Sequence, residues 1–291
     1  MEIIHFLREL ITEDTPILEL KKDPTITLQQ KYSVLGFSHE FYPYYMYYQN
    51  FEWYYFKQEE KNDEIKYPYY LLDELMGSYL AQFIGLSTIS FQIAKRDSFV
   101  GLASKNFREK ECDYYFFDQL PIAQLLEFST SFINIEMFKS SCIDNINVDK
   151  LVDCIFKLLA LDLYMLQMDR SRVNLQFQIN RDTKFLGLAP IYDFSNCADK
   201  WQYSTSFNIF NPIITLTYNN IPILCKKYPQ FLECLSMLVT KTMSSTWNQI
   251  CEDYHFNQDC FAYFKAKEHY QLKDENQKKL LRDIQARKIS I

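Results

Sequence analysis

Short hydrophobic runs bounded by polar turn residues predict strands in the first third of the chain. The runs Tyr44–Tyr48 and Glu52–Gln58 are rich in aromatic residues and are separated by a short polar turn, a pattern typical of a β-hairpin. Ser87–Ala94 and Ser98–Leu102 form a similar pair around the polar sequence Lys-Arg-Asp. Both pairs predict antiparallel strands.

One prominent helix is predicted between these hairpins. From Tyr70 to Ile84 the hydrophobic residues recur at helical spacing, and Gly85 follows as a candidate C-terminal cap. A shorter amphipathic pattern predicts a helix over residues 2–11. Strand-like runs follow at residues 16–20 and 25–28.

The second half of the chain has mostly helical hydrophobic periodicity. Helical periodicity covers four segments: residues 122–128, 148–168, 230–246 and 275–288. Between the second and third lies a hairpin pattern, Leu175–Ile179 and Phe185–Leu188, joined by a polar turn. We therefore predict an α+β chain with two lobes: a β-rich lobe of residues 1–120 carrying one helix, and a mostly helical lobe of residues 121–291.

Composition limits the classes of function. The chain has 291 residues, 48% of them hydrophobic and 23% charged, as in folded domains. Its net charge of −6 argues against a nucleic-acid partner and favours a protein or small-molecule substrate. No apolar run reaches the roughly 18 residues typical of a membrane span, so we expect no membrane partner. The eight cysteines are scattered without C-x-x-C pairs, as expected of reduced core cysteines in a cytoplasmic protein.

The strongest candidate for chemistry is a set of three polar residues around the second hairpin. Asp169 follows the helical pattern, Asn174 lies five residues later at the entry to a strand, and Asp193 ends an apolar run. Carboxylate and amide oxygens are suitable ligands for Mg²⁺. This spacing is used by protein-kinase-like phosphotransferases. An Asp before a strand is also a common turn former, so the three residues alone leave coincidence open.

Other chemistry has less support in the sequence. The four histidines lack nearby cysteines or carboxylates at metal-ligand spacing, and no G-x-S-x-G motif is present. We therefore expect neither a zinc site nor a hydrolase triad. The charged terminal helical pattern has mixed signs, which favours a solvated face over a partner-binding surface.

The segments MDRSRVNLQF and FLGLAPIYDFS resemble the active-site signature of HipA-like serine/threonine kinases. That family has a D-x-H-x-x-N-type catalytic loop, a short hairpin and an L-x-P-x-Y-D motif ending in a metal-binding Asp. The upstream segment DELMGSYLAQFIGLSTIS resembles the family's helix, with Glu74 placed 11 residues before Gly85. GLASKNFRE at 101–109 resembles the strand and turn that follow. The resemblance covers residues 36–195 and implies a two-lobed, protein-kinase-like α+β fold that binds ATP and Mg²⁺ between its lobes.

The resemblance also implies roles for individual residues. Asp169 corresponds to the catalytic base, or the acid that orients the nucleophile. Asn174 and Asp193 correspond to the Mg²⁺ ligands. Lys57 corresponds to the strand lysine that contacts the α- and β-phosphates, and Glu74 to the helix acid beside it. Lys61, Lys66 and Asp73 are the neighbouring alternatives to these last two residues.

The loop that covers the phosphates is harder to recognise. Gly36 and Ser38 lie between predicted strands, where such a loop belongs, and are candidate nucleotide-binding residues. A single Gly matches G-x-G-x-x-G poorly, and an ordinary hairpin turn is the alternative. The family's loops are rich in Ser, which makes Ser33 and Ser38 candidate autophosphorylation sites.

Two departures from the family pattern concern the active site. Ser171 stands where the family has His, and Asp193 is followed by Phe194-Ser195 without a Gly. Neither removes a group that phosphoryl transfer requires. The implied activity is ATP- and Mg²⁺-dependent phosphorylation of Ser or Thr on a protein, with autophosphorylation. A small-molecule or lipid kinase and a pseudokinase acting as a binding module stay open as alternatives.

Overall fold

The computed structural model describes only part of the chain. The described residues are 7–20, 44–49, 52–59, 70–116, 119, 148–167, 170, 174–183, 186–194, 208–209, 216–217, 221–257 and 282. Several predictions lie outside them, including the strand at residues 25–28, the turn at Gly36 and the helix at residues 122–128.

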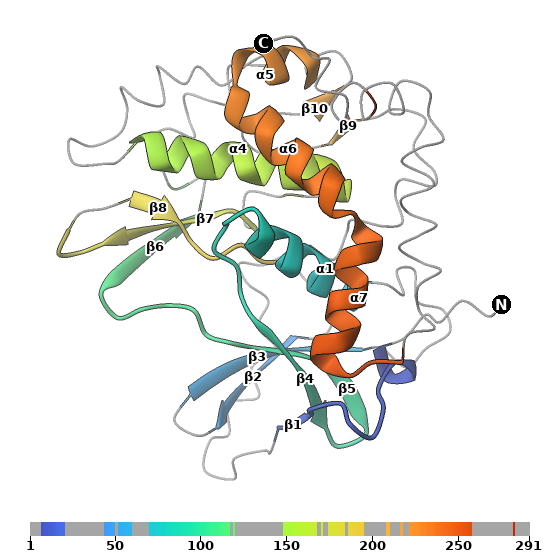
Figure 1. Cartoon of the computed structure of the whole chain (residues 1–291). Coiled ribbons are helices and arrows are strands. Elements are labelled where there is room, and N and C mark those ends of the chain that lie inside the picture. The colour runs from blue at the N-terminus through green and yellow to red at the C-terminus, as the bar shows by residue number, and fades with distance from the viewer. Residues whose placement is uncertain are drawn as a thin grey trace.

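A five-stranded sheet forms the lower part of the molecule in Figure 1, in the order β1-β4-β5-β3-β2. Its strands are β1 (Leu18–Glu19), β2 (Tyr44–Gln49), β3 (Glu52–Gln58), β4 (Phe91–Arg96) and β5 (Phe99–Lys105). The predicted first hairpin is confirmed, because β2 and β3 pair antiparallel. The first strand of the second hairpin was predicted to begin too early.

That second hairpin turns at Asp97-Ser98. Lys95 and Arg96 still pair with β5, and Asp97 has a φ of 52°. The polar character of Lys-Arg-Asp does not mark the turn, because exposed strand positions are also polar. The segment before β4 makes a different contact, a single bridge between Thr88 and Ile191.

Helix α1 (Tyr70–Phe83) matches its prediction within one residue. Its end is closed by Gly85, whose φ is +73°. The N–H of Leu86 donates to the carbonyl of Ala81, and that of Gly85 to Gln82, both at 2.9 Å. This pair of bonds is the Schellman motif, which a residue with a left-handed backbone completes. The predicted glycine cap is confirmed.

A three-stranded sheet combines β6 (Cys112–Phe116), β7 (Gln176–Asn180) and β8 (Leu186–Leu188). The hairpin of β7 and β8 is confirmed, and the Asn180 side chain accepts bonds from the N–H groups of Asp182 and Thr183 in its turn. Strand β6 was not predicted. It pairs with β7 across about 60 residues of sequence, a partner that local periodicity cannot reveal.

The described helices of the second half are α4 (Val148–Met165), α5 (Ile221–Lys227), α6 (Pro229–Lys241) and α7 (Met243–Tyr254). The prediction of one helix over residues 230–246 is wrong. Thr242 has a φ of 61° and separates α6 from α7, and its hydroxyl accepts a bond from the N–H of Ser245 at 3.1 Å. Thr242 therefore serves as the N-cap of α7, a role in which Ser and Thr are favoured.

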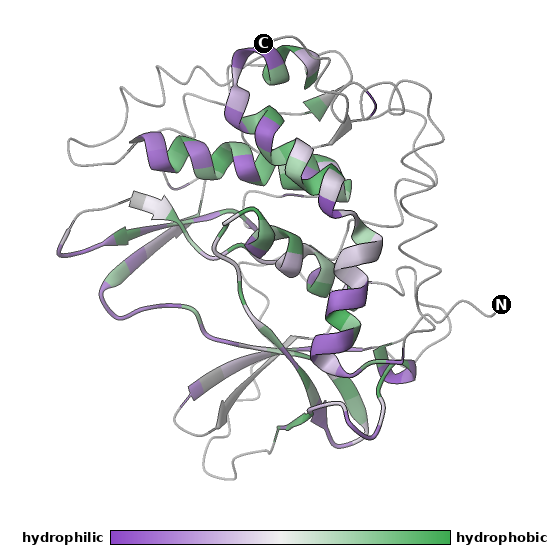
Figure 2. Ribbon diagram, viewed as in Figure 1, coloured by the Kyte–Doolittle hydropathy of each residue, from purple (hydrophilic) through white to green (hydrophobic). Residues whose placement is uncertain are grey.

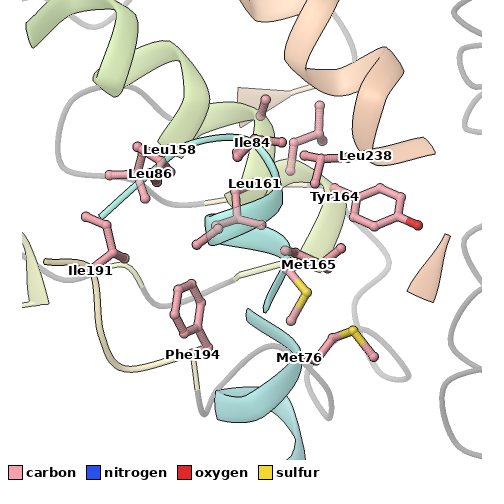
Figure 3. Packing of buried hydrophobic residues seen from close by; sticks show 14 of the residues in the cluster. Met76, Ile84, Leu86, Leu158, Leu161, Tyr164, Met165, Ile191, Phe194 and Leu238 are labelled. Atoms are coloured by element: carbon pink, nitrogen blue, oxygen red, sulfur yellow. The ribbon is translucent and has the colours of Figure 1, made fainter. Parts of the chain in front are cut away.

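Helix α4 is crossed by α6 and lies above the three-stranded sheet in Figure 1. Hydrophobic and hydrophilic residues alternate along it in Figure 2. It packs against α6, α1 and β8. Figure 3 shows the buried side chains at this junction, where Leu161 and Met165 of α4 approach α1 and Phe194 lies between Ile191 and Met76. Short strands β9 (Asn208–Ile209) and β10 (Leu216–Thr217) pair with each other. No helix in the described residues is long and apolar enough to span a membrane.

The described part of the predicted N-terminal helix is a short 3₁₀ turn, η1 (Leu7–Glu9), held to the end of β3 by Glu59. The Glu59 carboxylate accepts bonds from the N–H groups of Leu7 and Arg8. Only 4% of Glu59 is exposed. Burial raises the pKa of this carboxyl from 4.5 to about 7, against the lowering effect of the two N–H donors.

We expect Glu59 to make the protein less stable as the pH rises from about 4.5 to about 7. In this window the folded state binds more protons than the unfolded state, so the free energy of unfolding falls with increasing pH. The full effect of such a shift is about 3 kcal/mol. Urea unfolding at a series of pH values measures it, and Glu59→Gln is expected to remove this part of the slope. An identical slope in Glu59→Gln would contradict the prediction.

Candidate active site

A buried ion pair joins the large sheet to α1. Lys57 belongs to β3, and its Nζ lies 2.5 Å from Oε1 of Glu74 on α1. The same Nζ lies 3.5 Å from Oδ1 of Asp193. Because the Lys57 and Glu74 side chains are only 4% and 3% exposed, solvent screens their attraction little. The predicted strand lysine and helix glutamate therefore meet, and Asp193 joins them.

Glu74 also fixes the backbone after Asp193. Its Oε2 accepts a bond from the N–H of Phe194 at 3.0 Å. Burial raises the pKa of the Glu74 carboxyl, and the nearby Asp193 charge acts in the same direction, whereas Lys57 lowers it. The lysine is thus the cation that favours the ionised form of Glu74.

Asp193 contacts residues from several parts of the chain. Its Oδ2 accepts a bond from the Nδ2 of Asn174 at 2.6 Å, and its backbone carbonyl accepts one from the Nε2 of Gln167 at 2.8 Å. Its φ is 60°. The left-handed backbone that a Gly would adopt easily is therefore taken by Asp193 itself, and Asp is among the side chains that tolerate it best.

The chemistry of the donors fits a hard cation. Asn174 and Asp193 place an amide and a carboxylate within hydrogen-bond distance of each other. A half-turn of the Asn174 amide exchanges its nitrogen for its oxygen, and the oxygens of both side chains would then face one ion. Mg²⁺ commonly takes one or two protein oxygens and completes its shell with substrate phosphates and water. The two side chains are therefore sufficient as the protein's share of such a site.

Gly77 allows α1 to approach closely the segment Tyr192–Phe194, called the Asp193 loop from here on. A Cβ at this position would lie 2.2 Å from Cγ of Phe194, whose side chain is fully buried. Gly77 lies one helical turn from Glu74, so both residues face the same loop. The low glycine content, five residues in the chain, and the helix-interior position were the signals of a special role.

Gly101 has a comparable role beside Lys57. It pairs with Gln58 across β5 and β3, and a Cβ there would lie 2.2 Å from the backbone oxygen of Lys57. A side chain at position 101 would displace the strand that carries the lysine. Sequence reasoning found the segment but not this function of its glycine.

The structure thus gathers four of the predicted site residues: Lys57, Glu74, Asn174 and Asp193. The predicted catalytic Asp169 lies outside the described residues, as do Gly36, Ser38 and the alternative lysines Lys61 and Lys66. Gln167 and the buried residues Asp162 and Arg170 contact the same loop or each other, and sequence reasoning had not selected them.

The chain has a protein-kinase-like α+β fold. A strand of its large sheet carries a buried lysine, a helix glutamate pairs with that lysine, and an Asp-Asn pair lies beside the helical layer. The structure of the proinflammatory kinase CtkA of Helicobacter pylori is similar to this chain, with a TM-score of 0.59 and 17% identity over 95% of this chain and 99% of that one. HipA of Shewanella oneidensis, from a toxin–antitoxin complex with HipB and operator DNA, has a TM-score of 0.55 and 12% identity over 92% of this chain and 67% of that one.

The sequence itself matches no protein-family model and no curated protein. At these levels of identity the similarity to solved structures establishes the fold. The predicted α+β, protein-kinase-like fold is confirmed, and the resemblance to HipA-like kinases is confirmed at the level of the fold.

Proposed function

We propose that this protein is an ATP- and Mg²⁺-dependent serine/threonine protein kinase. The observation that supports it most directly is the joint contact of Asp193 with Lys57 and Asn174, while Glu74 holds the lysine. A cation, an acid and an amide from three parts of the chain converge, as binding of a metal–phosphate complex requires.

Each residue has a defined task in this proposal. Lys57 donates to the α- and β-phosphate oxygens, and Glu74 holds its ammonium in place. Asn174 and Asp193 hold Mg²⁺, which neutralises the charge of the phosphates when bound. Asp169 orients the acceptor hydroxyl and takes its proton. Catalysis rests on positioning and electrostatic stabilisation, since the phosphoryl group passes to the acceptor without a covalent bond to the catalytic residues.

The proposed acceptor is a Ser or Thr hydroxyl of a protein, including this protein itself. The resemblance to HipA-like kinases in the active-site segments supports this choice over a small molecule or lipid. We further propose that the protein binds no nucleic acid directly, in keeping with its net charge of −6, and that it acts in the cytoplasm, in keeping with its scattered cysteines.

Incubation with radiolabelled ATP and Mg²⁺ tests the proposal. We expect label on the protein, with Ser33 and Ser38 as the first sites to examine by mass spectrometry. Asp169→Ala and Asp193→Ala are each expected to reduce the transfer at least about a hundredfold, as loss of groups that act in the transition state does. Unchanged transfer in both variants would contradict the assigned site.

The same experiment separates the alternative functions. ATP binding without transfer to any acceptor identifies a pseudokinase. Transfer to a small molecule or lipid extract, with none to protein, identifies the other class of kinase. ATP affinity is measured in parallel by calorimetry, so that loss of binding and loss of chemistry are distinguished.

A further inference from the structure

Asp162 and Arg170 form a fully buried ion pair beside the candidate active site. Asp162 belongs to α4, and Arg170 directly follows the predicted catalytic Asp169 in the sequence. Oδ1 of Asp162 lies 2.9 Å from Nη2 of Arg170 and 3.2 Å from its Nε. Both side chains are 0% exposed. This two-point contact fixes the plane of the guanidinium.

The same guanidinium also binds the Asp193 loop. Its Nη1 donates to the backbone carbonyl of Tyr192 at 2.8 Å, and its Cζ lies 5.1 Å from the centre of the Phe194 ring. Arg170 therefore contacts the residues on both sides of Asp193. Cation–π contact and a charge-assisted hydrogen bond act together on this short segment.

Gln167 completes the arrangement from the other side of Asp169. Its amide donates to the carbonyl of Asp193, the residue after the one that Arg170 binds. Two consecutive carbonyls are thus held by side chains that flank the predicted catalytic acid in sequence. Asp193 has a φ of 60°, which costs more for Asp than for Gly. External contacts are needed to maintain such a conformation.

Net stability does not explain why this pair is buried. A buried ion pair seldom stabilises a protein more than well-packed apolar side chains of the same size. An apolar pair would leave the Tyr192 carbonyl without the bond from Arg170, since only the guanidinium fork reaches Asp162 and Tyr192 together. The ion pair instead holds Arg170 in the position from which it binds the Tyr192 carbonyl.

We infer that Asp162 and Arg170 form a positioning pair that holds the Asp193 loop in its left-handed conformation, so that the Asp193 carboxylate faces Lys57 and Asn174. This inference rests on the proposed function for its catalytic meaning. Asp162 orients Arg170, and Arg170 orients the loop. The pair itself need not touch nucleotide, metal or acceptor.

Hydrogen exchange measured by mass spectrometry tests the pair without relying on activity. In Arg170→Met and Asp162→Asn we expect the Phe194 amide, which donates to Glu74, to exchange at least about tenfold faster than in the natural protein. Phe156→Leu is the matched control. Phe156 is a buried residue of the same helix, and its ring centre lies 4.4 Å from that of Tyr228. The substitution therefore weakens the packing of α4 without removing a contact to the Asp193 loop.

Phosphotransfer gives the second measurement. We expect the two variants to need about tenfold more Mg²⁺ for half-maximal transfer, while ATP binding without Mg²⁺ and the Mg²⁺ response of Phe156→Leu stay unchanged. Arg170→Lys keeps a positive charge opposite Asp162 and is therefore expected to destabilise the fold less than Arg170→Met. Its ammonium cannot reach Asp162 and Tyr192 together, so the Phe194 amide is expected to exchange as fast as in Arg170→Met.

The two measurements separate the failure of this inference from that of the proposed function. If the natural protein transfers no phosphate, the proposed function fails, and hydrogen exchange still decides the role of the pair. If Phe194 exchanges equally in Asp162→Asn, Arg170→Lys and Phe156→Leu, the pair contributes only general stability and the inference is overturned.

Discussion

Replacement of Lys57 by methionine is expected to lower phosphotransfer by about a thousandfold, the range found when a preorganised charge is removed from an active site. Its ammonium lies between Glu74 and Asp193, so the variant leaves two carboxylates facing each other in a buried site. Without the lysine, the already raised pKa of Glu74 rises further. We expect an unfolding free energy lower by about 3–5 kcal/mol, as for other broken buried pairs.

A second substitution separates the two effects of this change. Glu74→Gln removes the unpaired charge and keeps an oxygen for the Phe194 N–H. The double variant Lys57→Met/Glu74→Gln is therefore expected to recover much of the stability and none of the activity. Calorimetric unfolding and a radiolabel assay measure the two quantities. Recovery of transfer in the double variant would show that Lys57 serves only to neutralise Glu74.

Lys105 provides the matched control for this experiment. It lies on β5, the strand beside β3, and its side chain is 57% exposed, with Nζ 3.7 Å from Glu52. Exposed pairs of this kind contribute about 0–1 kcal/mol. Lys105→Met is expected to change neither stability nor transfer appreciably.

Gly77→Ala is expected to lower both stability and phosphotransfer although alanine is the better helix former. In an open helix this substitution stabilises by about 1 kcal/mol. Here the new methyl group would lie 2.2 Å from Cγ of Phe194, whose side chain is fully buried, so the ring or the helix must shift. We expect a loss of about 2 kcal/mol or more in unfolding free energy and a fall in phosphotransfer of at least about tenfold, because Asp193 is displaced with Phe194.

A double-mutant cycle identifies the clash as the cause. Phe194→Ala removes the ring atoms that the methyl group would meet, so Gly77→Ala in that background is expected to be neutral or stabilising. Chemical unfolding of the four proteins gives the coupling energy. Additive effects would contradict the contact between Gly77 and Phe194. Gln82→Ala, at an exposed position of the same helix, controls for helix propensity.

These experiments share one structural theme, the short segment Tyr192–Phe194. Glu74 binds it from α1, Arg170 and Gln167 bind it from the region of the predicted catalytic acid, and Lys57 binds its carboxylate from the large sheet. Each substitution removes one of these contacts or forces the segment away. The expected losses differ because, of the residues that hold this segment, only Lys57 is proposed to touch the substrate complex, as Asp193 itself does.

The sequence by itself determined the elements whose signals are local. Aromatic composition and a polar turn defined the hairpin of β2 and β3, and the helical period with Gly85 defined α1 and its cap. The polar turn at Asn180 defined the hairpin of β7 and β8. For the site, spacing identified Asn174 and Asp193, whereas Lys57 and Glu74 were selected through a family resemblance, because no local pattern distinguishes them from their charged neighbours.

Only the tertiary structure decided which groups meet and where the chain turns. It placed β6 beside β7, divided the helix predicted over residues 230–246 at Thr242, and buried Arg170 against Asp162. It also set Phe194 against Gly77, the position of α1 that lacks a side chain. The pairing of β6 with β7 and the fit of Phe194 against Gly77 depend on residues far away in the chain, which a local pattern cannot report. The break at Thr242 and the contact of Arg170 with Asp162 involve near neighbours, but they depend on turns of the backbone that hydrophobic periodicity does not report.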